Sequence, residues 1–329
     1  MKKLSLILLA IAGLAACNKA EIITADKGEV IAFADAFVDN STKTTDNSFS
    51  GTNLPEEFLV YGTTKGDELD ANLVQIFDAV EVTKSSGVYT YNDAYTQYWI
   101  EGNIYNFAAI VNADKNKVTQ INDMPSSLVY TSAYATDGSV ADTPDLMYAT
   151  ATCEGQAAGS NAKVAFTFNH LLANVKFTVK NTMASNPAEN LYEYEVTNIQ
   201  IKNAYTSGKC TLSTKAWTEQ ADADKVVKFG NVAAVGSASV LSASSEYARL
   251  LIPAQYQLNI TFTLTTKLKG TAINVENLTL EPTVNFVAGN AYNLVIAKGN
   301  PGDKIEFSVQ TVSEWIPNAA GAETPIGTL

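Results

Sequence analysis

Apolar residues alternate with polar or small residues along most of this chain. The alternating runs are Ile31–Phe33, Tyr89–Tyr91, Val164–Phe168, Val175–Val179, Ile199–Ile201, Ile260–Leu264, Tyr292–Ile296 and Ile305–Val309. A period of two residues buries one set of side chains and leaves the other set in water. Because Thr, Asn, Ser and Gly fill the intervals, the runs end in turn-forming residues. The sequence therefore predicts an all-β protein of many short strands, which is typical of β-sandwiches.

Helical periodicity is weak, so we expect little helix; only 67–79 and 115–123 approach it. The chain has 329 residues, which is long enough for two domains. The small, flexible segment 153–163 reads as a linker. With this linker as the boundary, we expect an N-terminal β-sandwich over 30–152 and a C-terminal β-sandwich over 164–329.

The N-terminus carries an export signal. Lys2 and Lys3 precede an apolar run from Leu4 to Leu14, and Ala15-Ala16 stand before Cys17. The run is shorter than the roughly 20 residues that a membrane-spanning helix needs. A Cys directly after small residues is typical of a bacterial lipobox. We therefore expect removal of residues 1–16, acylation of Cys17 and a tether over 17–29; the alternative is ordinary secretion.

The charge balance excludes some partners. The chain has 22 basic and 34 acidic residues, and loss of Lys2 and Lys3 changes the net charge from −12 to 20 − 34 = −14. This acidity argues against nucleic acid and against adsorption to anionic lipid, so the lipid on Cys17 would hold the protein at the membrane. In an oxidising compartment Cys153 and Cys210 could form a disulfide or remain two thiols.

The sequence offers no catalytic constellation. The one histidine, His170, follows the Val164–Phe168 run beside two leucines, a setting that favours a packed core residue over a base. No cysteine or second histidine stands at metal-ligand spacing, and no Gly-rich phosphate loop follows a strand. We expect a protein that is not an enzyme and has no metal and no cofactor.

Aromatic residues crowd one stretch and allow two interpretations. The stretch contains Tyr89, Tyr91, Tyr95, Tyr98, Trp99 and Tyr105. Such rings stack on sugars, and they also serve as ordinary core residues of a sandwich. Surface glycan binding therefore stays open as an alternative function.

A set of segments, taken in chain order, resembles one family. They are Phe58–Tyr61, Tyr89–Tyr91, Tyr98-Trp99, Tyr105–Ala109, Asp145–Ala149, Val164–Val175, Ser207-Gly208 with Trp217, Leu250–Gln255, Gly289–Tyr292 and Ile305–Trp315. The set resembles the fimbrillin family, the type V pilus subunits of anaerobic gut and oral bacteria. The resemblance implies two transthyretin-like β-sandwich domains, export as a lipoprotein to the outer membrane and the cell surface, and a role in adhesion.

The resemblance also implies assembly by strand exchange. In the family a protease cuts after a basic residue behind the first strand, and a segment near the C-terminus of another subunit fills the groove. Carried over here, the first strand is Val30–Val38, with Ile31, Phe33 and Phe37 facing the groove, and the cut follows Lys43. The alternating residues Ile305, Phe307 and Val309 are the candidate donor, and the tail 316–329 is a poorer one.

The cut site departs from the family because its basic residue is Lys43 rather than Arg. Either a protease that accepts lysine cuts there, or the strand and its lipid stay in place and the subunit suits the base of the fibre. The expected partners are other fimbrial subunits, outer-membrane lipid through Cys17, and a surface glycan or protein of a host or another bacterium. The alternative is a glycan-binding surface lipoprotein.

Overall fold

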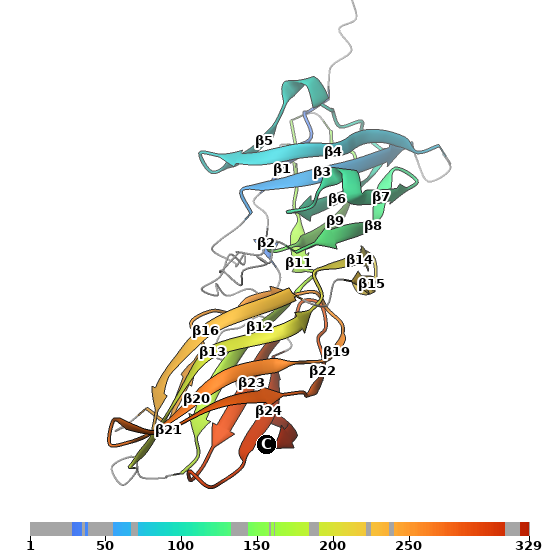
Figure 1. The fold of residues 1–329 in the computed structure, drawn as a ribbon. Helices are drawn as coiled ribbons and strands as arrows, with labels where there is room; N and C mark the ends of the chain where they lie inside the picture. The colour runs from blue at the N-terminus through green and yellow to red at the C-terminus, as the bar shows by residue number, and fades with distance from the viewer. Residues whose placement is uncertain are drawn as a thin grey trace, which may run out of the picture.

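The computed structural model describes residues 28–34, 37–38, 55–66, 72–132, 144–157, 159–160, 162–183, 191–221, 225–236, 240–312 and 323–328. Cys17, Lys43 and the side chain of Phe37 lie outside this description. Figure 1 shows two β-rich bodies joined end to end, which we call the upper and lower bodies. In the described residues the helical elements are two 3₁₀ turns, η1 (Asp93–Tyr95) and η2 (Lys115–Lys117). The predicted all-β fold is therefore confirmed.

The upper body is built on a seven-stranded sheet. Its order is β2 (Phe37–Val38), β11 (Thr167–His170), β9 (Met147–Glu154), β6 (Ile104–Val111), β3 (Glu57–Lys65), β4 (Val74–Ser85) and β5 (Val88–Tyr91). A short parallel pair, β1 (Ala32–Phe33) with β10 (Lys163–Val164), completes it. Alternate side chains enclose an aromatic-rich cluster, the upper core, which includes Phe58, Phe77, Tyr105, Phe107 and Phe166.

The lower body is a sandwich of two sheets. One sheet runs β17 (Ser242–Ser244), β12 (Ala173–Asn181), β23 (Ala291–Lys298), β24 (Ile305–Val312) and β25 (Glu323–Thr328), and β18 (Arg249–Leu251) also pairs with β12. The other runs β16 (Lys225–Val235), β13 (Tyr192–Ala204), β20 (Ile260–Leu268) and β21 (Thr271–Leu280). Their facing side chains form the lower core, and β19 (Gln255–Gln257) pairs with β22 (Thr283–Asn285).

A third sheet joins sequence from both predicted domains. Its order is β15 (Ala216–Ala221), β14 (Ser207–Thr211), β8 (Met124–Thr131) and β7 (Val118–Ile121). Strands β8 and β14 are hydrogen-bonded from Thr131↔Ser207 to Ser127↔Thr211. Beneath this sheet lies a junction core that draws residues from both bodies, including Tyr61, Ile110, Leu128, Leu171, Cys210 and Leu250. Figure 1 shows β14 and β15 below β8, between the two bodies.

The predicted boundary at residue 164 needs correction. Val164, Phe166 and Phe168 are buried in the upper core, and β11 pairs with β9 and β2. The strand expected to open the second sandwich therefore closes the first one. The chain passes through the junction core at Leu171 and Leu172, and the lower body begins with β12.

Candidate functional site: the slot that holds the first strand

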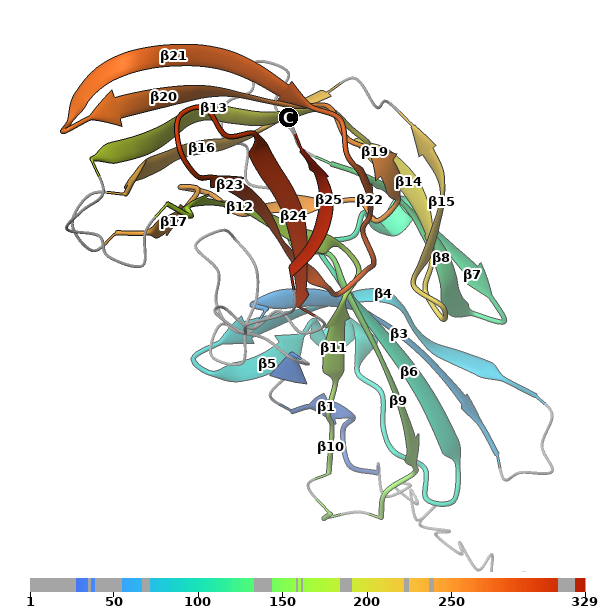
Figure 2. The same cartoon turned by 90° about the horizontal axis from the view of Figure 1, so that it is seen from below.

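The segment 28–34 contains the described beginning of the predicted strand Val30–Val38 and is called the first strand from here on. It lies between two neighbours in the upper body. On one side Ile31 N–H donates to the Gln97 carbonyl at 2.9 Å, and Trp99 N–H donates to the Glu29 carbonyl at 2.8 Å. On the other side β1 pairs in parallel with β10, and Ala34 N–H donates to the Val164 carbonyl at 2.8 Å. Figure 2 shows β1 beside β10. The surrounding strands thus form a slot that hydrogen-bonds both edges of the first strand.

The first strand fills the slot with two apolar side chains. Ile31 is 0% exposed and Phe33 is 2% exposed. The ring of Phe33 lies near the rings of Phe58, Phe77, Tyr91, Phe107 and Phe166, with centroid distances between 5.8 and 6.4 Å. We call these five partners the aromatic box. Offset and edge-on ring contacts each add roughly 0.5–1.5 kcal/mol beyond the burial of area.

Two glycines make room for this packing. A Cβ on Gly62 would lie 3.0 Å from Cδ2 of Phe77 and 3.1 Å from Cδ1 of Phe107, so a side chain there would press on the box. A Cβ on Gly28 would lie 2.1 Å from the Trp99 carbonyl oxygen. The first strand can therefore approach the 97–99 segment closely only with glycine at position 28. Sequence reasoning did not identify these positions, because their role depends on distant neighbours.

Two polar contacts hold the first strand in register. The Tyr91 hydroxyl donates to the Ile31 carbonyl at 2.7 Å, and the Ser160 hydroxyl donates to the Glu29 carboxylate at 3.1 Å. Burial raises the pKa of Tyr91, which keeps its hydroxyl protonated as a donor. Tyr91 thus contributes to the slot both its ring and its hydroxyl, a second role that the sequence did not indicate.

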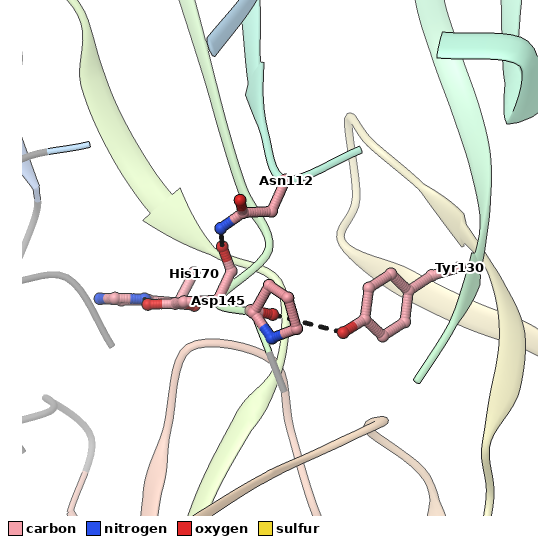
Figure 3. Close-up of polar contacts among 5 residues, drawn as sticks. Asn112, Tyr130, Asp145 and His170 are labelled. Atoms are coloured by element: carbon pink, nitrogen blue, oxygen red, sulfur yellow. Dashed lines mark hydrogen bonds and ion pairs between the residues drawn. The ribbon is translucent and has the colours of Figure 1, made fainter. Parts of the chain in front are cut away.

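His170 is the last residue of β11 and precedes Leu171 and Leu172 of the junction core. Figure 3 shows it with its polar neighbours. Its Nδ1 is 2.8 Å from Oδ2 of Asp145, and the two side chains are 3% and 0% exposed. The Asn112 amide donates to the Asp145 carbonyl at 2.9 Å, and the Tyr130 hydroxyl donates to the Pro144 carbonyl at 3.3 Å. This packing agrees with the structural role expected for His170.

The predicted donor residues are built into the lower body. Strand β24 pairs with β23 on one side and β25 on the other, and Ile305, Phe307 and Val309 are at most 8% exposed in the lower core. A strand bonded at both edges cannot leave without dismantling its sheet, so this position does not suit a detachable donor. Among the described strands, β25 stands at the end of that sheet.

The two downstream cysteines are separate thiols. Cys153 is half-buried against the upper core on β9, whereas Cys210 is fully buried in the junction core on β14. The sequence left open whether Cys153 and Cys210 form a disulfide, and in the described structure these two residues do not. Burial raises the pKa of the Cys210 thiol to about 12, which keeps it protonated at physiological pH.

Most rings of the aromatic block are core residues. Tyr89, Trp99 and Tyr105 are at most 4% exposed, and Trp99 meets Tyr105 edge-on with centroids 4.7 Å apart. Tyr91 and Tyr98 are half-buried, and Tyr95 is 52% exposed. It borders a groove of about 580 Å³ whose polar lining includes Glu57, Asp78, Glu81, Asn92, Asn112 and Asp114.

The described residues contain neither a metal cluster nor a membrane-spanning helix. No group of three or more His, Cys, Asp or Glu side chains there is placed to hold a metal ion. Within the same part of the chain, no helix has the length and apolarity to cross a membrane.

The sequence profile described as fimbrillin-like matches residues 42–315. A solved structure of a fimbrial protein from Bacteroides vulgatus superposes with a TM-score of 0.59 at 14% identity, covering 88% of this chain and 100% of that one. A protein from Bacteroides ovatus, provisionally named for cell adhesion, superposes with a TM-score of 0.50 at 16% identity, covering 89% and 99%. Among curated proteins, none matches the chain. At these identities the two structures are similar in fold alone.

Proposed function

Because the chain belongs to the fimbrillin-like family, we propose that it is a structural subunit of a cell-surface fimbrium that joins its neighbours by strand exchange and serves adhesion. The observation that carries the proposal is the position of the first strand. It is held at both backbone edges and through Ile31 and Phe33 within one compact slot. Such a strand can be replaced by a strand of another subunit with the same pattern.

A slot filled by another strand has a lower free energy than a slot left empty. Loss of Ile31 and Phe33 would expose apolar surface worth roughly 3–6 kcal/mol, at about 1.5–3 kcal/mol for each side chain as an upper bound. The 97–99 and 163–164 segments would also present unpaired backbone groups to water. Open edges of this kind bind other strands. An emptied slot is therefore a strong acceptor for a donor strand.

Export and processing complete the proposal. Acylation of Cys17 would anchor the mature chain in the outer membrane at the cell surface, and cleavage after Lys43 would free the first strand together with its lipid. Without cleavage, the lipid and the strand stay and the subunit suits the base of the fibre. Partners would be other fimbrial subunits and a surface glycan or protein of a host or another bacterium.

Limited proteolysis tests the proposal. Mature protein is treated with a trypsin-like protease and run on a gel after mild heating. We expect a ladder of multimers together with a new N-terminus at Thr44. The Lys43→Ala variant should give no ladder, whereas the matched control Lys304→Ala, which removes an exposed lysine of the lower body, should behave as wild type. Complete cleavage after Lys43 with only monomer on the gel would refute strand exchange.

Glycan binding is a second candidate, supported by the groove beside Tyr95. Its carboxylates and amides can accept and donate hydrogen bonds to sugar hydroxyls, and an exposed ring can stack on a sugar face. Retention on polysaccharide columns that is lost in Tyr95→Ala would favour this candidate. Equal retention of the variant would argue against it.

A further inference from the structure

We propose that the first-strand slot selects its donor by an aromatic residue at the second inward position, so that the donor belongs to a subunit other than a copy of this chain. The inference rests on the proposed strand exchange and names the partner's chemistry. The first inward position, held by Ile31, takes an aliphatic side chain. The second, held by Phe33, lies inside the aromatic box defined above.

The box fits a flat ring rather than an aliphatic chain. The ring of Phe33 is nearly parallel to that of Phe166, with an interplanar angle of 17°. It is nearly perpendicular to the rings of Phe58 and Phe107, at 88° to each. Parallel and edge-on contacts of this kind are the preferred geometries of aromatic pairs. A branched aliphatic side chain presents neither a face nor an edge to these partners.

Four of the five rings of the box are fully packed and have little room to close around a smaller donor residue. Phe58, Phe77, Phe107 and Phe166 are themselves at most 2% exposed. The rings of Phe77 and Phe107 are already close to the backbone at Gly62. Because protein cores are close-packed, a side chain much smaller than Phe would leave a cavity. A donor strand with a small side chain at this position should therefore bind more weakly than a donor with an aromatic ring there.

Ile305 and Phe307 have the spacing of Ile31 and Phe33, but they lie in β24, which is bonded at both edges and does not suit a detachable donor. The tail after it, residues 316–329, does not carry the required aromatic residue. Residues 323–329 read Glu-Thr-Pro-Ile-Gly-Thr-Leu and contain no aromatic residue. When Ile326 is aligned with Ile31, Thr328 falls at the position of Phe33. The backbone of this segment is also hydrogen-bonded to β24, from Gln310↔Glu323 to Glu306↔Thr328. A second copy of the chain would thus offer a donor that fits the first position and leaves the box empty.

The alignment suggests a matched pair of probes. Full-length chain with Phe33→Leu has a loosened first strand and an intact box, and Phe33→Ala serves as a second loosened variant; thermal unfolding shows that each is folded. Fluorescent peptides of residues 28–38 and 318–329 are titrated by anisotropy. Each peptide has one partner variant, Phe33→Ala in the first and Thr328→Phe in the second.

We expect the 28–38 peptide to bind at least about 100-fold more tightly than its Phe33→Ala version, the fold-change for a deleted buried phenylalanine. The 318–329 peptide should be similarly weak, and Thr328→Phe should restore most of its affinity. Equal affinities of the two unmodified peptides, or no gain from Thr328→Phe, would overturn the selectivity while leaving strand exchange intact. Failure of the 28–38 peptide to bind either loosened chain would overturn strand exchange itself, and the inference with it.

Discussion

The ring of Phe33 stacks on the ring of Phe166, with centroids 5.9 Å apart. Phe33 belongs to the first strand, whereas Phe166 stands between β10 and β11, where the chain runs from the upper body toward the junction. One contact therefore joins the segment proposed to leave the fold to the segment that leads into the lower body. Removal of the first strand would therefore remove a ring contact from the packing of the upper core.

Truncation of Phe33 should strongly destabilise the intact chain. Phe33→Ala deletes a ring that is 2% exposed, and we expect a loss of about 3–5 kcal/mol in the free energy of unfolding. Urea unfolding followed by tryptophan fluorescence measures it. Val30→Ala is the matched control, because Val30 is 41% exposed on the same strand and should cost less than about 0.5 kcal/mol. Similar losses in the two variants would contradict the slot.

The strands could be predicted from the sequence because a period of two is a local signal. Val175–Val179, Ile260–Leu264 and Tyr292–Ile296 all fall within strands whose alternate side chains enter the lower core. The resemblance to fimbrillins supplied what periodicity lacks, namely the hypothesis that the run at Ile31 fills a groove and can be replaced by another strand. Its place between 97–99 and 163–164 required the structure.

The domain boundary could not be predicted, because it depends on pairing between distant segments. Nothing local to Ser207–Thr211 indicates that this strand bonds to Met124–Thr131. The apolar run at Phe166 reads the same whether it opens the second sandwich or closes the first. For the same reason the alternation at Ile305 indicates a strand with one buried face, whereas its pairing with β23 and β25 required the structure.

The contact between His170 and Asp145 should contribute strongly to stability. His170→Ala would leave a fully buried carboxylate without this partner, and we expect a loss of about 3–5 kcal/mol in the free energy of unfolding. Adding Asp145→Asn to it should cost less than the sum of the two single changes, since both remove the same contact. A double-mutant cycle in urea measures the coupling.

The half-exposed ion pair of Lys267 with Glu195 provides the control for that experiment. Its atoms are 2.9 Å apart, but the side chains are 22% and 36% exposed. Solvent screening should limit the cost of Lys267→Ala to less than about 1 kcal/mol. If His170→Ala costs no more than Lys267→Ala, the buried contact does not stabilise the junction.

Membrane attachment should depend on Cys17. Because the mature chain would carry a net charge of 20 − 34 = −14, ionic attraction to anionic lipid is unfavourable. We expect wild-type protein to remain in the membrane fraction after a high-salt wash and to leave it only with detergent. Cys17→Ser should abolish labelling with radioactive palmitate and shift the protein out of that fraction. Sedimentation of Cys17→Ser with membranes at wild-type levels would refute the lipid anchor.

Alkaline pH should destabilise the fold through Cys210. Burial raises the pKa of this thiol from 9.0 to about 12. Above pH 9 the unfolded chain therefore loses a proton that the folded chain keeps, and stability falls as pH rises. At 1.36 kcal/mol per pH unit, the loss from this group reaches about 1.4 kcal/mol by pH 10. Tyr61 and Tyr194, whose pKa values burial raises from 10.0 to about 12, add losses of the same sign that begin just below pH 10 and are common to wild type and a Cys210 variant.

The Cys210→Ala variant isolates that effect in the window between pH 9 and pH 10. The variant leaves a small cavity and should be less stable at every pH, so the informative quantity is the slope of the unfolding free energy against pH. Burial lowers the pKa of Lys176, which acts with the opposite sign, but it is common to both proteins and cancels in the difference. We expect a shallower alkaline slope in Cys210→Ala than in wild type. Parallel curves would mean that the thiol ionises equally in the folded and unfolded chains, which a group at 0% exposure in the junction core does not allow.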